Sequence, residues 1–462
     1  MEEIKAKIVA RTFEVTDECS PITSGSMIKD FNILSGKAAG VCYMPDDYLS
    51  EGIQNIDSAI KRADNTAKNG HISVFEHCYI TMVLELNKAL AMVLNSLGVY
   101  TTSEKSARYT KFIPQTDKEL NLYNKWLDII QRKILDEYPW IDDEALSKKL
   151  CKIMGVKYTK VVYNGSISQL KDDEWLEEEF TKIKKDITLP SYKLAQENAR
   201  YMISVFTPTV MEYTVSYRQL SNICDLFDTF LKSHDKTEFS NRLKPYVEKL
   251  NNEFKEILKL DEETLTHFKS NKNQHLRFIE SSTVSSLDPL VVENITSKKE
   301  SIGDSYTISY KGSLAMLAQA QRHRTIRYSM FLDKATEFYV PAIISKNGLE
   351  KEWLEDLKEI SDVFPQATLV RITEQGIFED FALKCKERLC GRAQLEIMKQ
   401  TIESLNKFVK NGFNLNCTNR LLLVNMLDRK NDMCAVPRCC FSDYECNETC
   451  QWGGKQAFTR LV

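Results

Sequence analysis

The stretch HCYITMVLELNKALAMVLNSLG, residues 77–98, joins an alternating, β-rich segment to a segment with helical spacing that ends at Gly98. The alternation predicts a half-buried strand, and the apolar spacing after it predicts a helix. The same order of patterns returns in SYTISYKGSLAMLAQAQRHR, residues 305–324, where the predicted helix ends in a basic run. This echo suggests an internal duplication, although three shared letters (LAM) in a helix are easily repeated by chance.

Helical spacing extends over most of the remaining chain, while residues 140–190 are too charged to assign. It predicts further helices at 54–69, 116–134, 349–363 and 377–411, and almost throughout 192–258 with a break near Pro208.

The polar, Lys-, Asn- and Ser-rich stretch 260–300 is typical of a connection between two parts of a chain. We therefore expect an α+β fold of two related halves, each a small antiparallel sheet packed with long helices. The expected boundaries are an N-terminal half 1–260, a connection 261–300 and a C-terminal half 301–462.

The composition is that of a globular enzyme with two or three domains. The chain has 462 residues, of which 43% are hydrophobic and 27% charged, and its net charge is -3. That balance argues against a chromatin-like or membrane-surface protein. No signal-like segment or long apolar run is visible, so we expect a cytoplasmic protein without membrane or nucleic-acid partners. The 13 Cys are mostly scattered, as is typical of reduced thiols.

Three short motifs carry candidate chemistry. Arg322-His323-Arg324 ends the second predicted helix and can hold a phosphate or pyrophosphate, because arginine presents a fixed fork of donors. Taken alone, a solvated basic helix end is the more common arrangement. The segment His71–His77 contains two His, but their spacing excludes a zincin motif, and a His in a turn is more often structural. Ser103–Tyr109 can line a polar pocket, although a helix N-terminus is the simpler interpretation of that segment alone.

Together these residues resemble the flavin-dependent thymidylate synthase (ThyX) family. Its members carry His-x-x-x-x-Glu-His before a strand. The signature Arg-His-Arg, seven residues, Ser follows, with Glu two before and Arg two after that Ser. The N-terminal half keeps His71, Glu76, His77, Glu104, Ser106 and Arg108, with Ser96-Leu97-Gly98 in place of the basic triplet. The C-terminal half keeps Gln319, Arg322, His323 and Arg324, with Met330, Leu332 and Lys334 in the Glu, Ser and Arg positions.

The later motifs divide in the same complementary way. Arg200 matches the nucleotide-contacting Arg, and Arg218 and Asn222 match the flavin-binding stretch, with Ser216 in place of its first Asn. A later Arg of the family falls on Phe227 in the first half and on Arg388 in the second. The flavin positions of the second half are Ile377, Glu379 and Leu383.

The resemblance implies reductive methylation of dUMP to dTMP with methylenetetrahydrofolate, FAD and NADPH. The family is homotetrameric with active sites between subunits. Complementary loss therefore implies a homodimer that forms a pseudo-tetramer. The resemblance implies that dUMP contacts Gln319, Arg322, Glu104, Ser106, Arg108, Arg200 and Arg388, with Arg388 and Ser106 as catalytic residues but Ser106 not as a covalent nucleophile. It implies that FAD contacts His71, Ser73, Glu104, Arg322, His323, Arg324, Arg218 and Asn222.

The tail 434–450, CAVPRCCFSDYECNETC, resembles that of some long members of the family. Cys439, Cys440, Cys446 and Cys450 have spacings loosely compatible with zinc, while a disulfide or reduced thiols are the alternatives.

Two other functions fit parts of the sequence. A related flavin- and folate-dependent enzyme could modify a pyrimidine nucleotide differently, because the folate site is poorly marked. A non-enzymatic nucleotide- or nucleic-acid-binding protein could use the basic helix end and a zinc tail, but the near-neutral net charge disfavours it.

Overall fold

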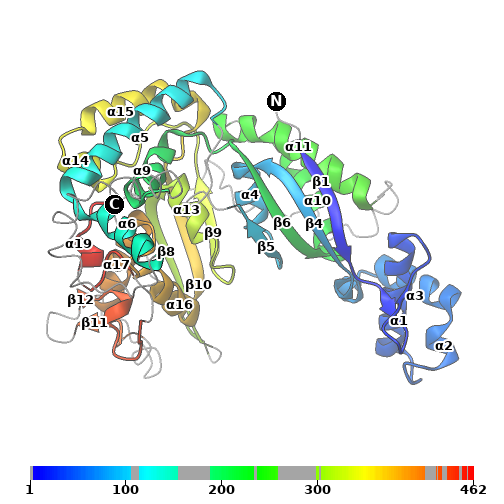
Figure 1. Cartoon of the computed structure of the whole chain (residues 1–462). Helices are drawn as coiled ribbons and strands as arrows, with labels where there is room; N and C mark the ends of the chain where they lie inside the picture. Colours follow the sequence, from blue (N-terminus) through cyan, green and yellow to red (C-terminus); the bar gives the residue numbers. More distant parts are fainter. Residues whose placement is uncertain are drawn as a thin grey trace. The chain divides into compact units, whose positions relative to one another are not determined.

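The computed structural model confirms an α+β fold with small antiparallel sheets and long helices (Figure 1). It describes residues 4–105, 114–153, 188–233, 237–258, 298–300, 303–410, 423, 425–428, 434–446, 450–454 and 456–462. Internal contacts divide the chain into two units, Met1–Lys105 with Phe206–Ser286 and Tyr328–Lys334, and Ser106–Val205 with Leu287–Arg327 and Ala335–Val462. The expected boundary at residue 260 stays a prediction, and the connection lies mostly outside the described residues.

The first sheet has the strand order β1-β4-β6-β5. Its strands are β1 (Lys5–Arg11), β4 (Tyr79–Asn87), β5 (Thr101–Glu104) and β6 (Pro208–Ser216). β6 pairs along its length with β4, from Tyr79 opposite Ser216 to Asn87 opposite Pro208. The prediction of helix almost throughout 192–258 is therefore wrong at β6. The β-branched and aromatic residues of this segment alternate between buried and less buried positions, as a strand paired on both sides requires.

The helices of the first unit lie between and after these strands in the chain. They are α1 (Met27–Tyr43), α2 (Glu51–Gln54), α3 (Ile56–Lys68), α4 (Lys88–Leu94), α10 (Tyr217–Lys232) and α11 (Glu238–Leu258), with the 3-10 turn η1 (Ile72–His77) before β4. α1 and α3 pack closely, since a Cβ on Gly36 would lie 1.8 Å from the carbonyl oxygen of Ala59. The short strands β2 (Glu14–Val15) and β3 (Pro21–Ile22) pair with each other.

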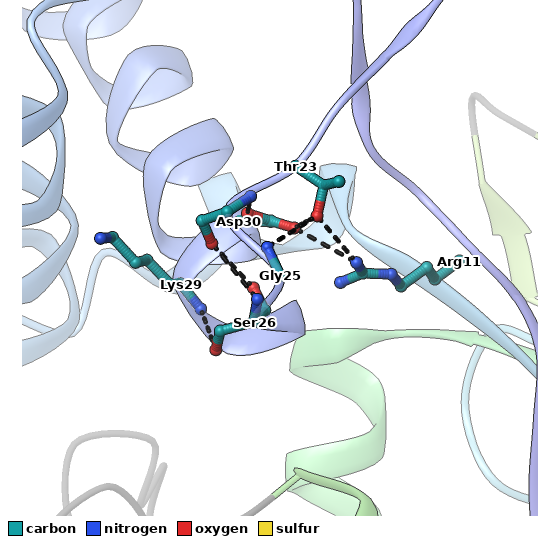
Figure 2. A network of polar contacts seen from close by, with 7 residues as sticks. Arg11, Thr23, Gly25, Ser26, Lys29 and Asp30 are labelled. Carbon is teal, nitrogen blue, oxygen red and sulfur yellow. Dashed lines mark hydrogen bonds and ion pairs between the residues drawn. The ribbon is translucent and has the colours of Figure 1, made fainter.

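A polar network fixes the start of α1 beside β1 (Figure 2). Thr23 Oγ1 donates to Asp30 Oδ2 at 2.6 Å, and the Ser24 amide donates to Asp30 Oδ1 at 2.7 Å. Arg11 lies 3.3 Å from the same carboxylate and donates to Thr23 Oγ1 at 3.1 Å. Burial opposes ionisation of Asp30, but these hydrogen bonds and the Arg11 charge together lower its pKa. Both oxygens of Asp30 thus accept hydrogen bonds from neighbouring residues, which indicates a structural role for this carboxylate.

The second sheet has the equivalent order β7-β8-β10-β9. Its strands are β7 (Lys298–Glu300), β8 (Gly303–Ser313), β9 (Arg327–Phe331) and β10 (Leu369–Ile377). β8 is followed at once by α13 (Leu314–Ala320), and β10 by α16 (Phe378–Arg388) and then α17 (Leu395–Lys410). Aromatic rings of Tyr306, Phe381 and Phe408 form the centre of the core under this sheet.

Several other helices of the second unit pack against one another. They are α5 (Asp117–Glu137), α6 (Trp140–Ile153), α9 (Pro190–Ala199), η2 (Arg200–Met202), α14 (Ala342–Lys346), α15 (Glu350–Glu359) and η3 (Ser361–Val363). Trp126 of α5 meets Trp353 of α15 edge-to-face at 4.8 Å between ring centroids. The segments after η2 and η3 meet at an antiparallel bridge between Ser204 and Pro365.

The C-terminal segment closes over the turn between α16 and α17. It contains β11 (Leu427–Asp428), β12 (Cys434–Ala435), η4 (Arg438–Cys440) and α19 (Gln456–Thr459). The Arg460 guanidinium donates to the carbonyl oxygens of Gly391 and Ala393. The tail is thus anchored on the residues that follow Arg388.

The two sheets share a residue register as well as a strand order. Asn87 and Ser313 each cap a seven-residue helix, and the first amide of each helix donates at 3.0 Å to a matching carbonyl, Thr207 or Thr368. β6 and β10 are both nine residues long and each runs directly into a helix. In this register Arg322-His323-Arg324 correspond to Ser96-Leu97-Gly98, and Arg388 corresponds to Phe227.

Candidate active-site residues

In the first unit, η1 and the first turns of α10 bring several of the expected flavin contacts into one neighbourhood. Arg218 Nη1 donates to Glu76 Oε1 at 2.8 Å, and both side chains are more than a third exposed. Asn222 lies one turn after Arg218 on α10 and is half-buried. Ser73 of η1 and His71, which directly precedes η1, are exposed, and the His71 ring meets Tyr43 edge-on. This exposed polar group is available to a ligand.

Glu104 ends β5 and makes an ion pair that spacing did not predict. Lys88 Nζ lies 2.6 Å from Glu104 Oε1, and both side chains are more than nine-tenths buried. Such a partner stabilises a buried carboxylate, so Glu104 is already paired with Lys88 in the absence of any ligand. Ser106 and Arg108 lie outside the described residues.

The position of the basic triplet is closed in the first unit. Leu97 is buried, and its carbonyl oxygen accepts a hydrogen bond from Gln219 Nε2 at 3.1 Å. Gly98 has φ of +66°, and a Cβ there would lie 2.1 Å from the same amide nitrogen. A larger residue at 98 would meet both strain and a collision.

In the second unit, Arg322, His323 and Arg324 lie in the turns between α13 and β9. The prediction that they end the helix is wrong, because α13 ends at Ala320. Arg322 and Arg324 are exposed, whereas His323 is buried. Within the described residues Arg322 makes no side-chain hydrogen bond or ion pair. Gln319, one turn earlier, has a buried Oε1 without a hydrogen-bond partner there. An exposed guanidinium and an unsatisfied buried amide are suited to a polar ligand.

His323 contacts Arg388 rather than solvent. Arg388 Nε donates to His323 Nε2 at 2.8 Å, across 65 residues of chain. The carboxylate of Glu387 lies 3.7 Å from that nitrogen. Burial, together with the charges of Arg388 and Lys384, lowers the pKa of His323 to about 2. The imidazole is therefore neutral at physiological pH.

Arg200 belongs to a buried chain of hydrogen bonds that reaches α13. Its Nη2 donates to Gln394 Oε1 at 2.5 Å, while its buried Nε has no partner within the described residues. Gln394 in turn contacts the Tyr201 hydroxyl, which donates to Glu396 Oε2 at 2.7 Å. Glu396 also accepts from the amide and hydroxyl of Ser313, the N-cap of α13. Burial raises the pKa of both Tyr201 and Glu396.

A second buried network supports the helix that carries Arg388. Lys384 Nζ lies 2.5 Å from Glu374 Oε2, and both side chains are fully buried. Tyr306 and Tyr310 donate their hydroxyls to the two oxygens of Glu374, and Gln400 accepts from Lys384 at 3.2 Å. Every partner is satisfied, so the network fixes α16 against β10.

The Cys-rich tail contains no metal group within the described residues. Cys439, Cys440 and Cys446 are exposed, Cys450 is half-buried, and all four are free thiols. Burial, with nearby Cys390 and Cys439, raises the pKa of Cys450, and Trp452 donates its amide to Cys450 Sγ at 3.4 Å. No three His, Cys, Asp or Glu side chains are grouped to hold a metal in the part of the chain that is described. The zinc interpretation stays a prediction.

Sequence spacing missed two partners of these candidates, Lys88 and Gln394, as well as Glu396, which belongs to the same network as Gln394. The sequence signals were Asn87-Lys88 at a predicted strand end and the short segment AQLEI, residues 393–397, at the start of α17. Among the described residues, no helix is long and apolar enough to span a bilayer.

No curated protein matches this chain. The model of the thymidylate synthase complementing protein family matches residues 28–254, a range that contains η1, β4, β5, β6 and α10. The same range holds His71 and Asn222, and also Glu76 and Arg218, which are joined by a hydrogen bond. Through residues 28–254 the chain belongs to the thymidylate synthase complementing protein family, whose members are flavin-dependent enzymes of thymidylate synthesis.

Proposed function

We propose that this protein is an FAD-dependent thymidylate synthase that converts dUMP to dTMP with methylenetetrahydrofolate and NADPH. We further propose that the chain is a tandem of two related halves, in which each working site takes one intact copy of every motif. The chain would then form a homodimer equivalent to a four-lobed assembly with two working and two degenerate sites.

One observation carries this proposal: the two halves differ in complementary ways at positions in a common register. His323 and Arg388 form a hydrogen-bonded pair, and their equivalents Leu97 and Phe227 are both buried and apolar. Random decay would not replace both members of a contacting pair while the other copy remains intact.

The flavin positions differ in the opposite direction. Arg218 and Asn222 lie on α10, whereas their equivalents on α16 are Glu379 and Leu383. Leu383 is 49% exposed, an apolar surface without donors for a pyrophosphate. The exposed polar residues of η1 and α10 fit a flavin, and those of α16 do not. This supports one flavin per chain.

The proposed chemistry assigns distinct tasks to the side chains. The flavin, reduced by NADPH, supplies the hydride when it is bound. Arg322, with Arg324, binds anionic phosphate groups, and Gln319 and Arg200 offer buried polar atoms to the nucleotide. Arg388 stabilises negative charge on the pyrimidine, and that charge raises electron density at C5. A guanidinium suits this task because it does not lose its proton.

The first-half residues complete the proposed site. Ser106 lies beside the uracil ring, Arg108 binds the nucleotide, and Glu104, held by Lys88, contacts substrate and flavin. His71, Ser73, Arg218 and Asn222 contact the flavin.

Product analysis tests the proposal. Purified protein is incubated with dUMP, methylenetetrahydrofolate, FAD and NADPH, and nucleotides are identified by mass spectrometry. We expect dTMP. A different modified pyrimidine nucleotide would favour the related-enzyme alternative, and salt-sensitive nucleic-acid binding without flavin would favour a binding protein.

Variants test whether both halves contribute. R322A and R108A should each abolish dTMP formation, while R132A, which alters an exposed Arg of α5, should not. Mixing R322A with R108A should restore activity if a site takes these two side chains from different chains. Continued inactivity of the mixture would place both in one chain.

A further inference from the structure

The buried histidine of the basic triplet has a defined partner. His323 Nε2 accepts from Arg388 Nε at 2.8 Å, and the His323 side chain is only 3% exposed. The two flanking residues, Arg322 and Arg324, are exposed. The triplet therefore presents two cations outward and one imidazole inward.

Only a neutral imidazole can make this contact. Nε2 must carry a lone pair to accept a hydrogen bond, and an imidazolium has none. The charged groups facing it come from α16, namely Arg388, Lys384 and, at 3.7 Å, Glu387. Burial and the two cations lower the pKa of His323 to about 2. The acceptor is thus present throughout the physiological pH range.

This contact restricts the orientation of Arg388. A guanidinium is planar, with its five N–H donors in a fixed fork, so an acceptor at Nε restricts the plane of the whole group. Lys384, salt-bridged to Glu374, anchors the same helix one turn earlier. The position of the guanidinium is therefore set before any ligand arrives.

The degenerate half gives an independent observation. At the positions of His323 and Arg388 it has Leu97 and Phe227, which are 6% and 0% exposed. The acceptor and the donor are absent together. A histidine retained only to contact a ligand would not need to change along with the arginine.

We propose that His323 is a positioning residue that holds Arg388 in the orientation needed to stabilise the ionising pyrimidine, rather than a flavin ligand. This inference rests on the proposed thymidylate synthase function. His323 thus has a different task from Arg322 and Arg324, which bind phosphate or flavin.

Two variants separate the acceptor from the volume of the side chain. H323L places the residue of the degenerate half there and removes the acceptor, whereas H323Q keeps a side-chain oxygen that can reach Arg388 Nε. Loss of a hydrogen bond to a charged group should lower kcat in H323L roughly 10- to 100-fold. We expect KM for dUMP and flavin per chain to stay near wild type. H323Q should recover kcat to within about 5-fold.

A double-mutant cycle isolates the coupling. In an R388L background H323L should cost no further activity, because the group that His323 positions is already gone. Three results would overturn the positioning role. The first is equal kcat for H323L and H323Q, and the second is independent losses in the cycle. The third is loss of flavin in H323L with normal turnover once flavin is saturating. A wild-type protein that binds flavin but makes no dTMP overturns the proposed function instead. In that case the positioning role is tested by measuring dUMP affinity of the same variants by calorimetry. Independent effects of H323L and R388L on that affinity would overturn it.

Discussion

Replacing His323 with glutamine is expected to remove an acid-dependent loss of stability from the second unit. The pKa of His323 is lowered from 6.5 to about 2 by burial and by the charges of Arg388 and Lys384. Below pH 6.5 the unfolded chain binds a proton at this residue and the folded chain does not. Stability must therefore fall as pH falls through 6.5, and it is unaffected by this group well above that value.

The magnitude follows from linkage. Each pH unit below 6.5 costs about 1.4 kcal/mol, so at pH 5 the penalty from His323 is about 2 kcal/mol relative to pH 8. H323Q lacks the titrating group. The difference in free energy of unfolding, H323Q minus wild type, should therefore be about 2 kcal/mol larger at pH 5 than at pH 8.

Urea denaturation followed by tryptophan fluorescence measures this difference, since Trp126 and Trp353 lie in the same unit as His323. Other titrating groups are common to both proteins and cancel in the comparison. A wild-type minus H323Q difference that does not change between pH 5 and pH 8 would refute a neutral, buried His323.

Three further substitutions test the packing of the fold. K384M should destabilise the protein by about 3–5 kcal/mol, because it leaves Glu374 buried without its cation. Adding Glu374→Gln should recover part of this loss. A double variant no more stable than K384M would contradict the ion-pair account. W353A should cost about 3–5 kcal/mol through lost edge-to-face packing, and a cost below about 1 kcal/mol would contradict it. G98A should cost more than G70A, since both positions have positive φ but only Gly98 has a neighbour where the Cβ would lie; equal costs in urea melts would refute the collision.

Local patterns predicted the elements whose signals lie within one segment. The repeated unit of strand and helix at 77–98 and 305–324 is present as β4 with α4 and β8 with α13. The first predicted helix ends earlier than expected, at Leu94 rather than Gly98, because Gly98 belongs to the turn that contacts Gln219.

Strand β6 shows where sequence patterns failed. Its residues PTVMEYTVS alternate in burial, but helical patterns flank the segment on both sides, and its partners β4 and β5 are more than a hundred residues away. Strand β10 went unpredicted for a related reason, since its partner β8 lies more than fifty residues away. Non-local pairing, rather than local propensity, decides such strands.

The candidate site divides in the same way. Motif spacing singled out the triplet, Arg388 and the residues of η1 and α10, because these motifs are runs of fixed length, and their roles stay predictions. It expected a flavin contact for His323 and did not predict the hydrogen bond that the side chain makes with Arg388 across 65 residues. It also missed Lys88 and Gln394, since a buried partner is chosen by packing and leaves no spacing in the sequence.

The amount of flavin bound per chain tests the central claim most directly. The protein is saturated with FAD and desalted, and bound flavin is measured from its visible absorbance against protein concentration. The complementary halves predict about one flavin per chain, held by residues including Arg218 and Asn222, with R218A lowering it and R132A leaving it unchanged. About two flavins per chain would contradict the degenerate second copy, and none would contradict a flavin-dependent function.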